Sequence, residues 1–325
     1  MTKTNRILRA GQLSLAVLCA VVAGTASADV WPSRAIKFVV PFGPGGANDV
    51  VARAVAEGVS KQLGQPVIVE NKPGAGSVIG ADLVAKSAPD GYTFLTPAGG
   101  VITNSLIKTK MPYQPDDLVP VALMAVSPSV IVVAADSPVK DLKGLIARSK
   151  QGAGINFSTA GTGSTPHFVA EMLRLKTHAN IQIVPYKSGS EGMVAVITKQ
   201  VDATSEASVV VLNQIKGGKL RPLASTWSRR IAALPDIPTA KELGYPEVFI
   251  GHWSGIFAPK GTPDEILEKM NHAVAAALQS PEVRARFIPQ GIDPMGGSRA
   301  DFVKFLASEK GRLEPIVRAV HMQED

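Results

Sequence analysis

Stretches rich in Val and Ile alternate with helical periodicities along most of the chain. In the first helical stretch Val51, Val55, Val59 and Leu63 recur every four residues, and Gly64 is placed to end the helix. Strands that alternate with amphipathic helices are typical of parallel sheets covered by helices. The pattern therefore predicts an α/β fold.

The alternation forms two runs. The first run predicts strands at 35–42, 66–70 and 92–98 and helices at 47–63 and 77–87. The second run predicts helices at 139–150, 164–177, 190–199 and 208–216 and strands at 155–160, 181–186, 201–207 and 220–226.

Two apolar segments interrupt the alternation. Between Leu118 and Ala135 two predicted strands flank Ser127-Pro128-Ser129 without a helix, and residues 248–259 again lack flanking helices of their own. Two helix-free crossings about 120 residues apart suggest that one domain is inserted into another. We expect a discontinuous domain 1 and an inserted domain 2, with a cleft between them that closes about a hinge. Their predicted limits are 29–127 with 254–325 for domain 1, and 128–253 for domain 2.

Three helices are expected to close the chain. The segment Thr262-Pro263-Asp264-Glu265 predicts a capping box with proline at the first helical position. Ser298 with Asp301 predicts a similar start for the last helix. The alternative for the whole layout is an ordinary two-domain enzyme.

The first 28 residues have the pattern of a secretory signal peptide. A basic start containing Lys3, Arg6 and Arg9 precedes an apolar run from Leu13 to Val22, and Ala26-Ser27-Ala28 supplies the small residues for cleavage after Ala28. The apolar run is too short for a membrane anchor, which needs ~20 residues. Lipidation at Cys19 is disfavoured because Leu18, rather than a small residue, precedes it. We expect export to the periplasm.

Cysteine and charge narrow the possible roles of the exported chain. Cys19 is the only cysteine and leaves with the signal, so we expect no disulfide and no thiol chemistry. The sequence has 34 basic and 27 acidic residues, and three of the basic residues lie in the leader. The remaining 31 basic and 27 acidic residues give a mild positive charge, which favours the binding of anions. Nucleic-acid binding is disfavoured because Arg229-Arg230 is the only close pair of arginines.

The first candidate site is the turn Pro41-Phe42-Gly43-Pro44-Gly45-Gly46-Ala47-Asn48-Asp49. Gly45 and Gly46 let the backbone approach a ligand, and the helix that follows offers free N–H groups and the positive end of its dipole. Those features suit an anion; the alternative is a turn that needs glycine only for its geometry. A nucleotide is disfavoured because no G-x-x-x-x-G-K-[ST] motif is present.

Three further turns are candidates. The turn Gly74–Gly80, which contains Ser77, is expected to be a second point of close approach to the same cleft. The segment Ser158–His167 adds hydroxyl groups to glycine amides at another helix start, although Ser164 is also a favoured N-cap residue. In 184–192, Tyr186, Lys187 and Ser188 precede the next helix, and Lys187 is expected to be a surface lysine.

Motifs for catalysis are absent. The sequence has neither G-x-S-x-G nor H-E-x-x-H, and no His, Asp and Glu residues cluster at the spacing of a metal site. His167, three residues after Ser164, is interpreted as a capping or packing residue rather than a catalytic base. We expect no catalytic residues, no metal and no cofactor.

Several segments together resemble the Bug family, the periplasmic substrate-binding receptors of tripartite tricarboxylate transporters. They are "WPSRAIKFVVPFGPGGANDVVARAVAEGVSKQLGQPVIVENKPGAGSVIGADLVAKSAPDGYTFL", "STAGTGSTPH", "VPYKSGSEGMVAVITKQVDA", "LPDIPTAKELGYP" and "WSGIFAPKGTP". The resemblance covers essentially the whole mature chain. It implies a two-domain periplasmic-binding-protein fold (Venus flytrap, type II) with the ligand cleft between the domains and no catalysis.

The resemblance also implies which residues bind the ligand. Family members hold a ligand carboxylate on main-chain amides and bridging waters at the loop that corresponds to Phe42 through Asp49, and the second domain contributes further loops. The candidate ligand-binding residues are Phe42, Gly45, Gly46, Ala47, Asn48, Asp49, Ser77, Pro97, Ala98, Thr159, Ala160, Gly161, Ser164, Tyr186, Ser188 and Glu206.

The chain departs from the family pattern at two places. Ser205-Glu206-Ala207 stands where the family commonly has an Asp-Asn pair, and Tyr186-Lys187-Ser188-Gly189 stands where it often has "YKGG". Glu206 is either a cleft residue that pairs with an amine or a surface charge, and we favour the cleft. Trp253 either walls the cleft or packs in the hinge, and we favour packing.

The sequence thus predicts a monomeric periplasmic receptor for a small organic anion. The expected ligand is a mono- or dicarboxylate, an aromatic acid or an amino acid, and the expected partners are the integral membrane subunits of a tripartite tricarboxylate-type transporter. The alternatives are a ligand sensor without a transport role and an exported enzyme on the same hinged scaffold.

Overall fold

The computed structural model describes residues 31–324. The chain separates into two units, Met1–Ser33 and Arg34–Asp325, and the described helices and strands belong to the second. The predicted leader, its cleavage after Ala28 and Cys19 fall outside the described residues. Within 31–324, no helix combines the length and hydrophobicity that a membrane span requires.

The first run of elements agrees with the sequence pattern except at one helix. Gly64 ends the first helix in the left-handed region, with φ 67°, as expected. The helix α4 was not predicted, because "GVITNSLI" opens with glycine and is short and rich in β-branched residues. The elements are β1 (Ile36–Val40), α2 (Ala47–Leu63), β2 (Val67–Asn71), the 3₁₀ turn η1 (Ala75–Ser77), α3 (Val78–Ala85), β3 (Thr93–Leu95), α4 (Gly100–Ile107) and the 3₁₀ turn η2 (Pro115–Asp117).

The prediction of two strands between Leu118 and Ala135 was wrong. The structure has one strand there, β4 (Leu118–Ala134), which changes partners along its length. Up to Pro128 it pairs with β9 (Gly251–Pro259), and from Ser129 it pairs with β7 (Ala203–Ala207) and β8 (Leu220–Ser225). Pro128 offers no N–H, and it stands where the strand passes from one set of partners to the other.

The second run matches the predicted alternation. β5 pairs in parallel with both β6 and β7, which brings the carboxyl ends of these strands to one edge of the sheet. The remaining elements of this run are α5 (Leu142–Ser149), β5 (Ile155–Thr159), α6 (Thr165–Thr177), β6 (Ile181–Pro185), α7 (Gly189–Ile197) and α8 (Ser208–Lys216).

The three predicted closing helices are present, and one of their two predicted capping boxes is confirmed. Ser298 and Asp301 form the box at the start of α11. The box at Thr262 was wrong, because Pro263 is the N-cap and the Thr262 hydroxyl donates to the carbonyl of Pro259 at 2.8 Å. The closing elements are α9 (Asp264–Gln279), α10 (Pro281–Phe287), the 3₁₀ turn η3 (Ile288–Gln290), β10 (Asp293–Pro294) and α11 (Arg299–Ala319).

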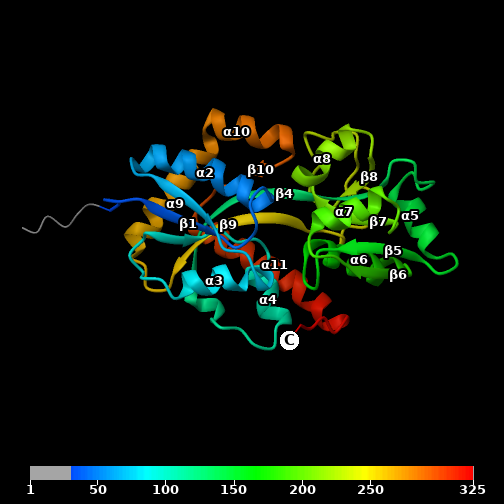
Figure 1. The fold of residues 1–325 in the computed structure, drawn as a ribbon, viewed down its shortest axis with the longest axis horizontal. Coiled ribbons are helices and arrows are strands. Elements are labelled where there is room, and N and C mark those ends of the chain that lie inside the picture. The colour runs from blue at the N-terminus through cyan, green and yellow to red at the C-terminus, as the bar shows by residue number, and fades with distance from the viewer. Residues whose placement is uncertain (1–30, 325) are drawn as a thin grey trace, which may run out of the picture. The chain divides into compact units, whose positions relative to one another are not determined.

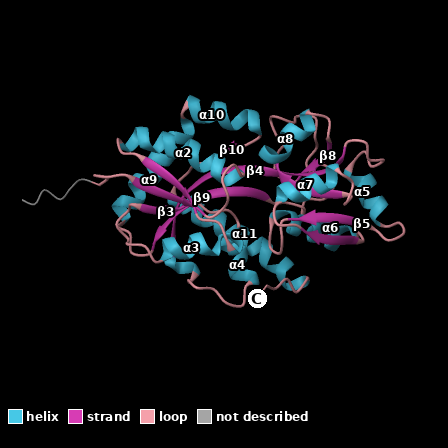
Figure 2. Cartoon of the chain, viewed as in Figure 1, coloured by secondary structure: helices cyan, strands magenta, loops and turns pink. Residues whose placement is uncertain are grey.

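The strands join in the order β2-β1-β3-β9-β4-β7-β5-β6, with β8 and β10 pairing additionally with β4. Around β1 and β3, α2, α9 and α10 lie on one face, and α3, α4 and α11 lie on the other (Figure 1). Around β5 and β7, α7 packs on one face and α6 on the other (Figure 2). The structure is a mixed α/β fold in which helices cover both faces of the sheet.

The last helix contributes to two hydrophobic clusters. Near its start, Phe302 packs with Trp253 and Phe257 in the cluster around β9. Near its end, Leu313 and Val317 belong to the cluster that contains residues of β5 and α6. The helix therefore connects the two groups of elements that β4 and β9 also join.

Candidate ligand-binding site

Asp49 organises the turn between β1 and α2. The residue is 3% exposed. One carboxylate oxygen accepts hydrogen bonds from the Gly45 N–H and the Arg53 Nε, each at 2.9 Å, and the other accepts from the Asn71 amide at 2.9 Å. Asn71 also donates to the carbonyl of Phe42 at 3.0 Å. Both ends of the turn are thus tied to one buried carboxylate.

The same contacts set the charge state of Asp49. Burial acts to raise the pKa of this carboxyl. The hydrogen bonds from Arg53, Gly45 and Asn71, together with the Arg53 charge, outweigh that effect and hold the pKa below its usual range. Asp49 is therefore an anion at neutral pH whose acceptor sites face the protein itself.

The start of α2 leaves its amide groups open. Gly46 is the N-cap, and in the described structure no side chain caps the first turn. A β-carbon added at Gly45 would meet nothing within 4 Å, and one at Gly46 would meet only the Gly43 carbonyl, at 3.7 Å. Ala47 and the buried Asn48 follow in the first turn. Uncapped amides and the positive helix end suit a carboxylate at this position.

Ser77, Pro97 and Ala98 lie around the start of α4. Ser77 is 2% exposed, and its hydroxyl is 3.5 Å from the amide nitrogen of Asn104. Asn104, within α4, also donates to the Gly76 carbonyl at 2.8 Å. The Pro97 carbonyl accepts from the Gly255 N–H, and the Ala98 carbonyl accepts from the Val101 N–H.

The loop after β5 contains the candidates Thr159, Ala160, Gly161 and Ser164. Thr159 is 1% exposed, and its hydroxyl oxygen has no hydrogen-bond partner among the described residues. Ser164 is the N-cap residue of α6, but its hydroxyl donates to the Gly161 carbonyl at 2.7 Å instead of capping the helix.

His167 and Gly163 fix this loop in place. The His167 Nδ1 accepts the Gly163 N–H at 3.2 Å, so His167 binds the residue that precedes the N-cap of α6. A β-carbon at Gly163 would overlap the Ile107 Cδ1, so the loop lies directly against the end of α4. This contact brings the Thr159–Ser164 group beside α4, whose Asn104 contacts Ser77.

Tyr186, Ser188 and Glu206 gather around the start of α7. The Tyr186 N–H donates to the Thr159 carbonyl at 2.9 Å, which joins this group to the preceding loop. The Ser188 hydroxyl accepts the Glu191 N–H at 3.2 Å as the N-cap of α7. Glu206 lies near the end of β7, where a β-carbon added at Gly189 would overlap its carboxyl group.

Glu206 is buried rather than a surface charge, and the residue is 6% exposed. Burial raises the pKa of its carboxyl to about 7, and a hydrogen bond from the backbone of Ala207 offsets only part of that rise. No described residue forms an ion pair with it. A carboxyl group with this environment is a candidate for a functional role.

The candidate ligand residues therefore lie in two groups. The residues from Phe42 to Asp49 are hydrogen-bonded to Asn71 of β2 and to the carbonyl of Thr96, the residue after β3, which accepts from Asn48 at 3.5 Å. The other candidates form a connected series that runs from the start of α4 through the β5 loop to the start of α7.

Trp253 packs in the protein interior, as expected. It is 2% exposed and makes edge-on contacts with Phe302 and Phe305, at ring-centroid distances of 6.0 and 5.7 Å.

The paired arginines form ion pairs within the protein: Arg229 binds Asp293, and Arg230 binds Glu242. Across residues 31–324 no three His, Cys, Asp or Glu side chains gather as metal ligands would.

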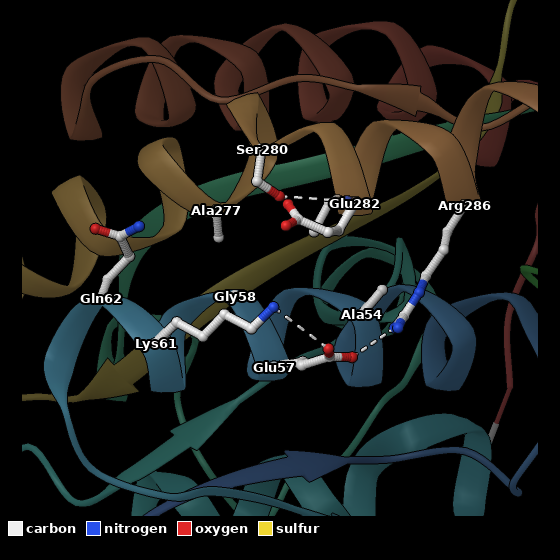
Figure 3. Close-up of a pocket in the computed structure, with 10 residues that line it drawn as sticks. Ala54, Glu57, Gly58, Lys61, Gln62, Ala277, Ser280, Glu282 and Arg286 are labelled. Carbon is white, nitrogen blue, oxygen red and sulfur yellow. Dashed lines mark hydrogen bonds and ion pairs between the residues drawn. The ribbon is translucent and has the colours of Figure 1, made fainter.

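A separate hollow of about 190 Å³ lies between α2, α9 and α10, away from every candidate ligand residue (Figure 3). Three of its charged side chains pair with one another: Glu57 binds Arg286 at 2.7 Å and Lys61 at 3.6 Å.

Sequence reasoning missed Arg53, Asn71 and Asn104. Asp49 and Arg53 are four residues apart on a predicted helix, and this spacing could have indicated the role of Arg53. Asn71 and Asn104 gave no such signal, because they meet their partners only through the tertiary fold.

Comparison with known proteins identifies a family and solved relatives. The model of the tripartite tricarboxylate transporter family receptor matches residues 51–322. BugT of Bordetella pertussis is 37% identical over 310 residues, which cover 94% of this chain and 95% of BugT. The periplasmic binding protein BugD superposes with a TM-score of 0.81 at 31% identity, covering 91% of this chain and 100% of that one. The chain therefore has the two-domain type II fold of periplasmic binding proteins.

Two similar structures contain a ligand. MatC from Rhodopseudomonas palustris, with bound malate, has a TM-score of 0.79 at 32% identity and covers 88% of this chain and 100% of its own. Rpa4515 from R. palustris, with adipate, has a TM-score of 0.83 at 32% identity and covers 90% of this chain and 99% of its own.

Proposed function

The chain belongs to the tripartite tricarboxylate transporter receptor family, in its Bug branch, and from this membership we propose that it is a periplasmic receptor that captures a small organic anion. It delivers the ligand to the membrane subunits of a tripartite tricarboxylate-type transporter. Its role is binding and release rather than catalysis, and it acts as a monomer.

One observation carries the proposal: the open, uncapped start of α2 behind a glycine turn that Asp49 holds in shape. Backbone amides at a helix start bind a carboxylate without a dedicated arginine. The ligands of two similar structures, malate and adipate, are both dicarboxylates, which supports this class of ligand.

The proposed domains are 29–127 with 254–325 and 128–253. The change of partners in β4 after Pro128 and the start of β9 at Gly251 support a hinge at these two strands. Ligand binding would close the second domain, with the candidate residues Thr159–Ser164 and Tyr186–Ser188, over the carboxylate held by the first.

Isothermal titration calorimetry of residues 29–325 with malate, succinate, adipate, glutarate, benzoate and the common amino acids tests the proposal. We expect saturable one-to-one binding of at least one carboxylate. Absence of heat and of thermal stabilisation with every compound, in protein refolded from denaturant to remove any co-purified ligand, would contradict the proposed function.

A further inference from the structure

We propose that Glu206 is a specificity residue that binds a protonated amine on the ligand, so that the receptor selects amino-bearing carboxylates over plain ones. The inference rests on the proposed function and narrows its ligand class. It is carried by the placement of a buried carboxyl group with no cationic partner beside two loops that contain candidate ligand residues.

The position of Glu206 follows from the sheet. It lies opposite Val130 on β4, and Val130 packs in the cluster that contains Met193 and Val196 of α7. Because residues directly opposite each other on neighbouring strands share a face, Glu206 is on the face that α7 covers. Tyr186 packs against the same cluster. The carboxyl group therefore lies at the carboxyl edge of the parallel strands, where α/β proteins bind their ligands.

Glycine at position 189 makes room for the carboxyl group. A β-carbon there would overlap the carboxyl carbon and both carboxyl oxygens of Glu206. Gly189 does not have a positive φ, so its conformation alone does not call for glycine. The close approach of Glu206 to the first residue of α7 is the feature that requires it.

Glu206 is not needed to cap α7. The Ser188 hydroxyl accepts the Glu191 N–H, and the Glu191 carboxylate accepts the Lys187 N–H at 3.2 Å. The start of the helix thus already has a side-chain cap from Ser188, and Glu191 binds the residue before it. Lys187 is exposed, and within the described chain it forms no ion pair with Glu206.

A cation on the ligand would supply the missing partner. A buried carboxylate without a counter-charge is unfavourable, and an ammonium group that binds it restores the balance. None of the candidate ligand residues is Lys or Arg, so a second ligand carboxylate would meet only neutral donors and the like charge of Glu206. A ligand with one carboxylate at the start of α2 and one ammonium at Glu206 would leave both charges matched.

Matched ligand pairs that differ by one amine test the inference. The pairs are L-aspartate with succinate, L-glutamate with glutarate, and 4-aminobutyrate with butyrate, each measured by calorimetry at pH 8, where Glu206 is ionised. We expect the wild-type protein to bind the amino member of at least one pair roughly 10- to 100-fold more tightly. The Glu206→Gln variant, which keeps the shape and removes the charge, should bind both members within about threefold of each other.

Two further variants test whether the preference depends on the charge of Glu206 itself. Glu206→Asp keeps the charge on a shorter side chain and should retain part of the preference, which also covers the case in which the Gln variant folds poorly. Glu247→Gln removes an exposed carboxylate that pairs with Lys176 and should leave the preference unchanged.

The outcomes separate this inference from the proposed function. If plain carboxylates bind as well as their amino partners, or if Glu206→Gln leaves the preference intact, the amine site is refuted while the carboxylate receptor stands. If neither these compounds nor malate and adipate bind the wild-type protein, the proposed function itself fails and the inference fails with it.

Discussion

At the scale of single residues, two buried carboxylates have opposite environments. Asp49 is surrounded by donors that lower its pKa, so it serves as a fixed anion that shapes a turn. Glu206 receives one backbone hydrogen bond, and burial raises its pKa. The Asp49 carboxylate has its hydrogen-bond donors within the protein. The Glu206 carboxyl group has no cationic partner there, and we propose that the ligand supplies one.

Replacing Gly46 by Val should abolish carboxylate binding with little loss of stability. Gly46 has φ −76°, which valine adopts readily, and the new β-carbon would meet only a carbonyl 3.7 Å away. The side chain would instead occupy the approach to the amides of α2. We expect the dissociation constant measured by calorimetry to rise by ~100-fold or more.

Gly311→Val is the matched control for this variant, because Gly311 lies in α11 with nothing within 4 Å of its added β-carbon. It should leave the affinity unchanged. Unaltered affinity in the Gly46→Val protein would show that the ligand does not approach α2 at this turn.

Glu206 should also make the stability depend on pH. Its pKa is about 7 in the folded protein against an ordinary 4.5, so between these values the folded state binds more protons than the unfolded state. The free energy of unfolding therefore falls as pH rises from 4.5 to 7, by an amount on the order of 3 kcal/mol. Glu206→Gln removes this loss and should be more stable than the wild type at pH 8.

Urea denaturation of both proteins at pH 4.5 and pH 8 measures this difference. His252, whose pKa burial lowers to about 4, has the opposite effect, since it costs stability as pH falls below 6.5. Because His252 is present in both proteins, the difference between them isolates Glu206. The same change in the free energy of unfolding between pH 4.5 and pH 8 in both proteins would contradict the assignment of a raised pKa to Glu206.

At the scale of elements, three segments connect the two groups of strands. β4 and β9 run side by side from Leu118 with Pro259 to Pro128 with Gly251. α11 begins against β9 and ends in the cluster around β5 and α6. A hinge formed by β4 and β9 must therefore also accommodate the packing of the last helix.

Leu313→Ala should show that α11 stabilises the second group of elements. Leu313 is 2% exposed in the cluster that contains residues of α6 and β5. Its truncation should lower the free energy of unfolding by about 2–5 kcal/mol, measured by urea denaturation. Val303→Ala, at a position of the same helix that is 50% exposed, should change it by less than about 0.5 kcal/mol. Equal effects of the two changes would refute the packing role of the end of α11.

At the scale of the whole molecule, the fold and the family agree on a binding protein. The similar structure BugD is a periplasmic binding protein, and two other similar structures contain the dicarboxylates malate and adipate. A ligand that contacts both domains binds only the folded protein, which links binding to stability.

A bound carboxylate should therefore stabilise the protein by ~2.7 kcal/mol at one hundred times its dissociation constant. In a thermal-shift assay this corresponds to an increase in Tm of a few degrees for a chain of this size. The increase should grow with the logarithm of the ligand concentration. In the Gly46→Val protein the same ligand concentrations should produce no increase.

The sequence alone determined the alternation of strands and helices, the limits of α2 and α8, the two helix-free crossings and the family. These features depend on local periodicity, on glycine at a helix end and on motifs that are contiguous in the chain. The same local signals placed the turns at Phe42–Asp49, Thr159–Ser164 and Tyr186–Ser188 at helix starts.

The tertiary structure decided what local signals do not contain. It showed one continuous β4 in place of two strands, because hydrogen-bond partners far along the chain keep the strand extended through Pro128. It joined Asp49 to Asn71 and Gly163 to Ile107, pairs that approach only when the sheet and its helices pack. It also buried Glu206 beneath Gly189, and burial rather than residue type determines the protonation of that carboxyl group.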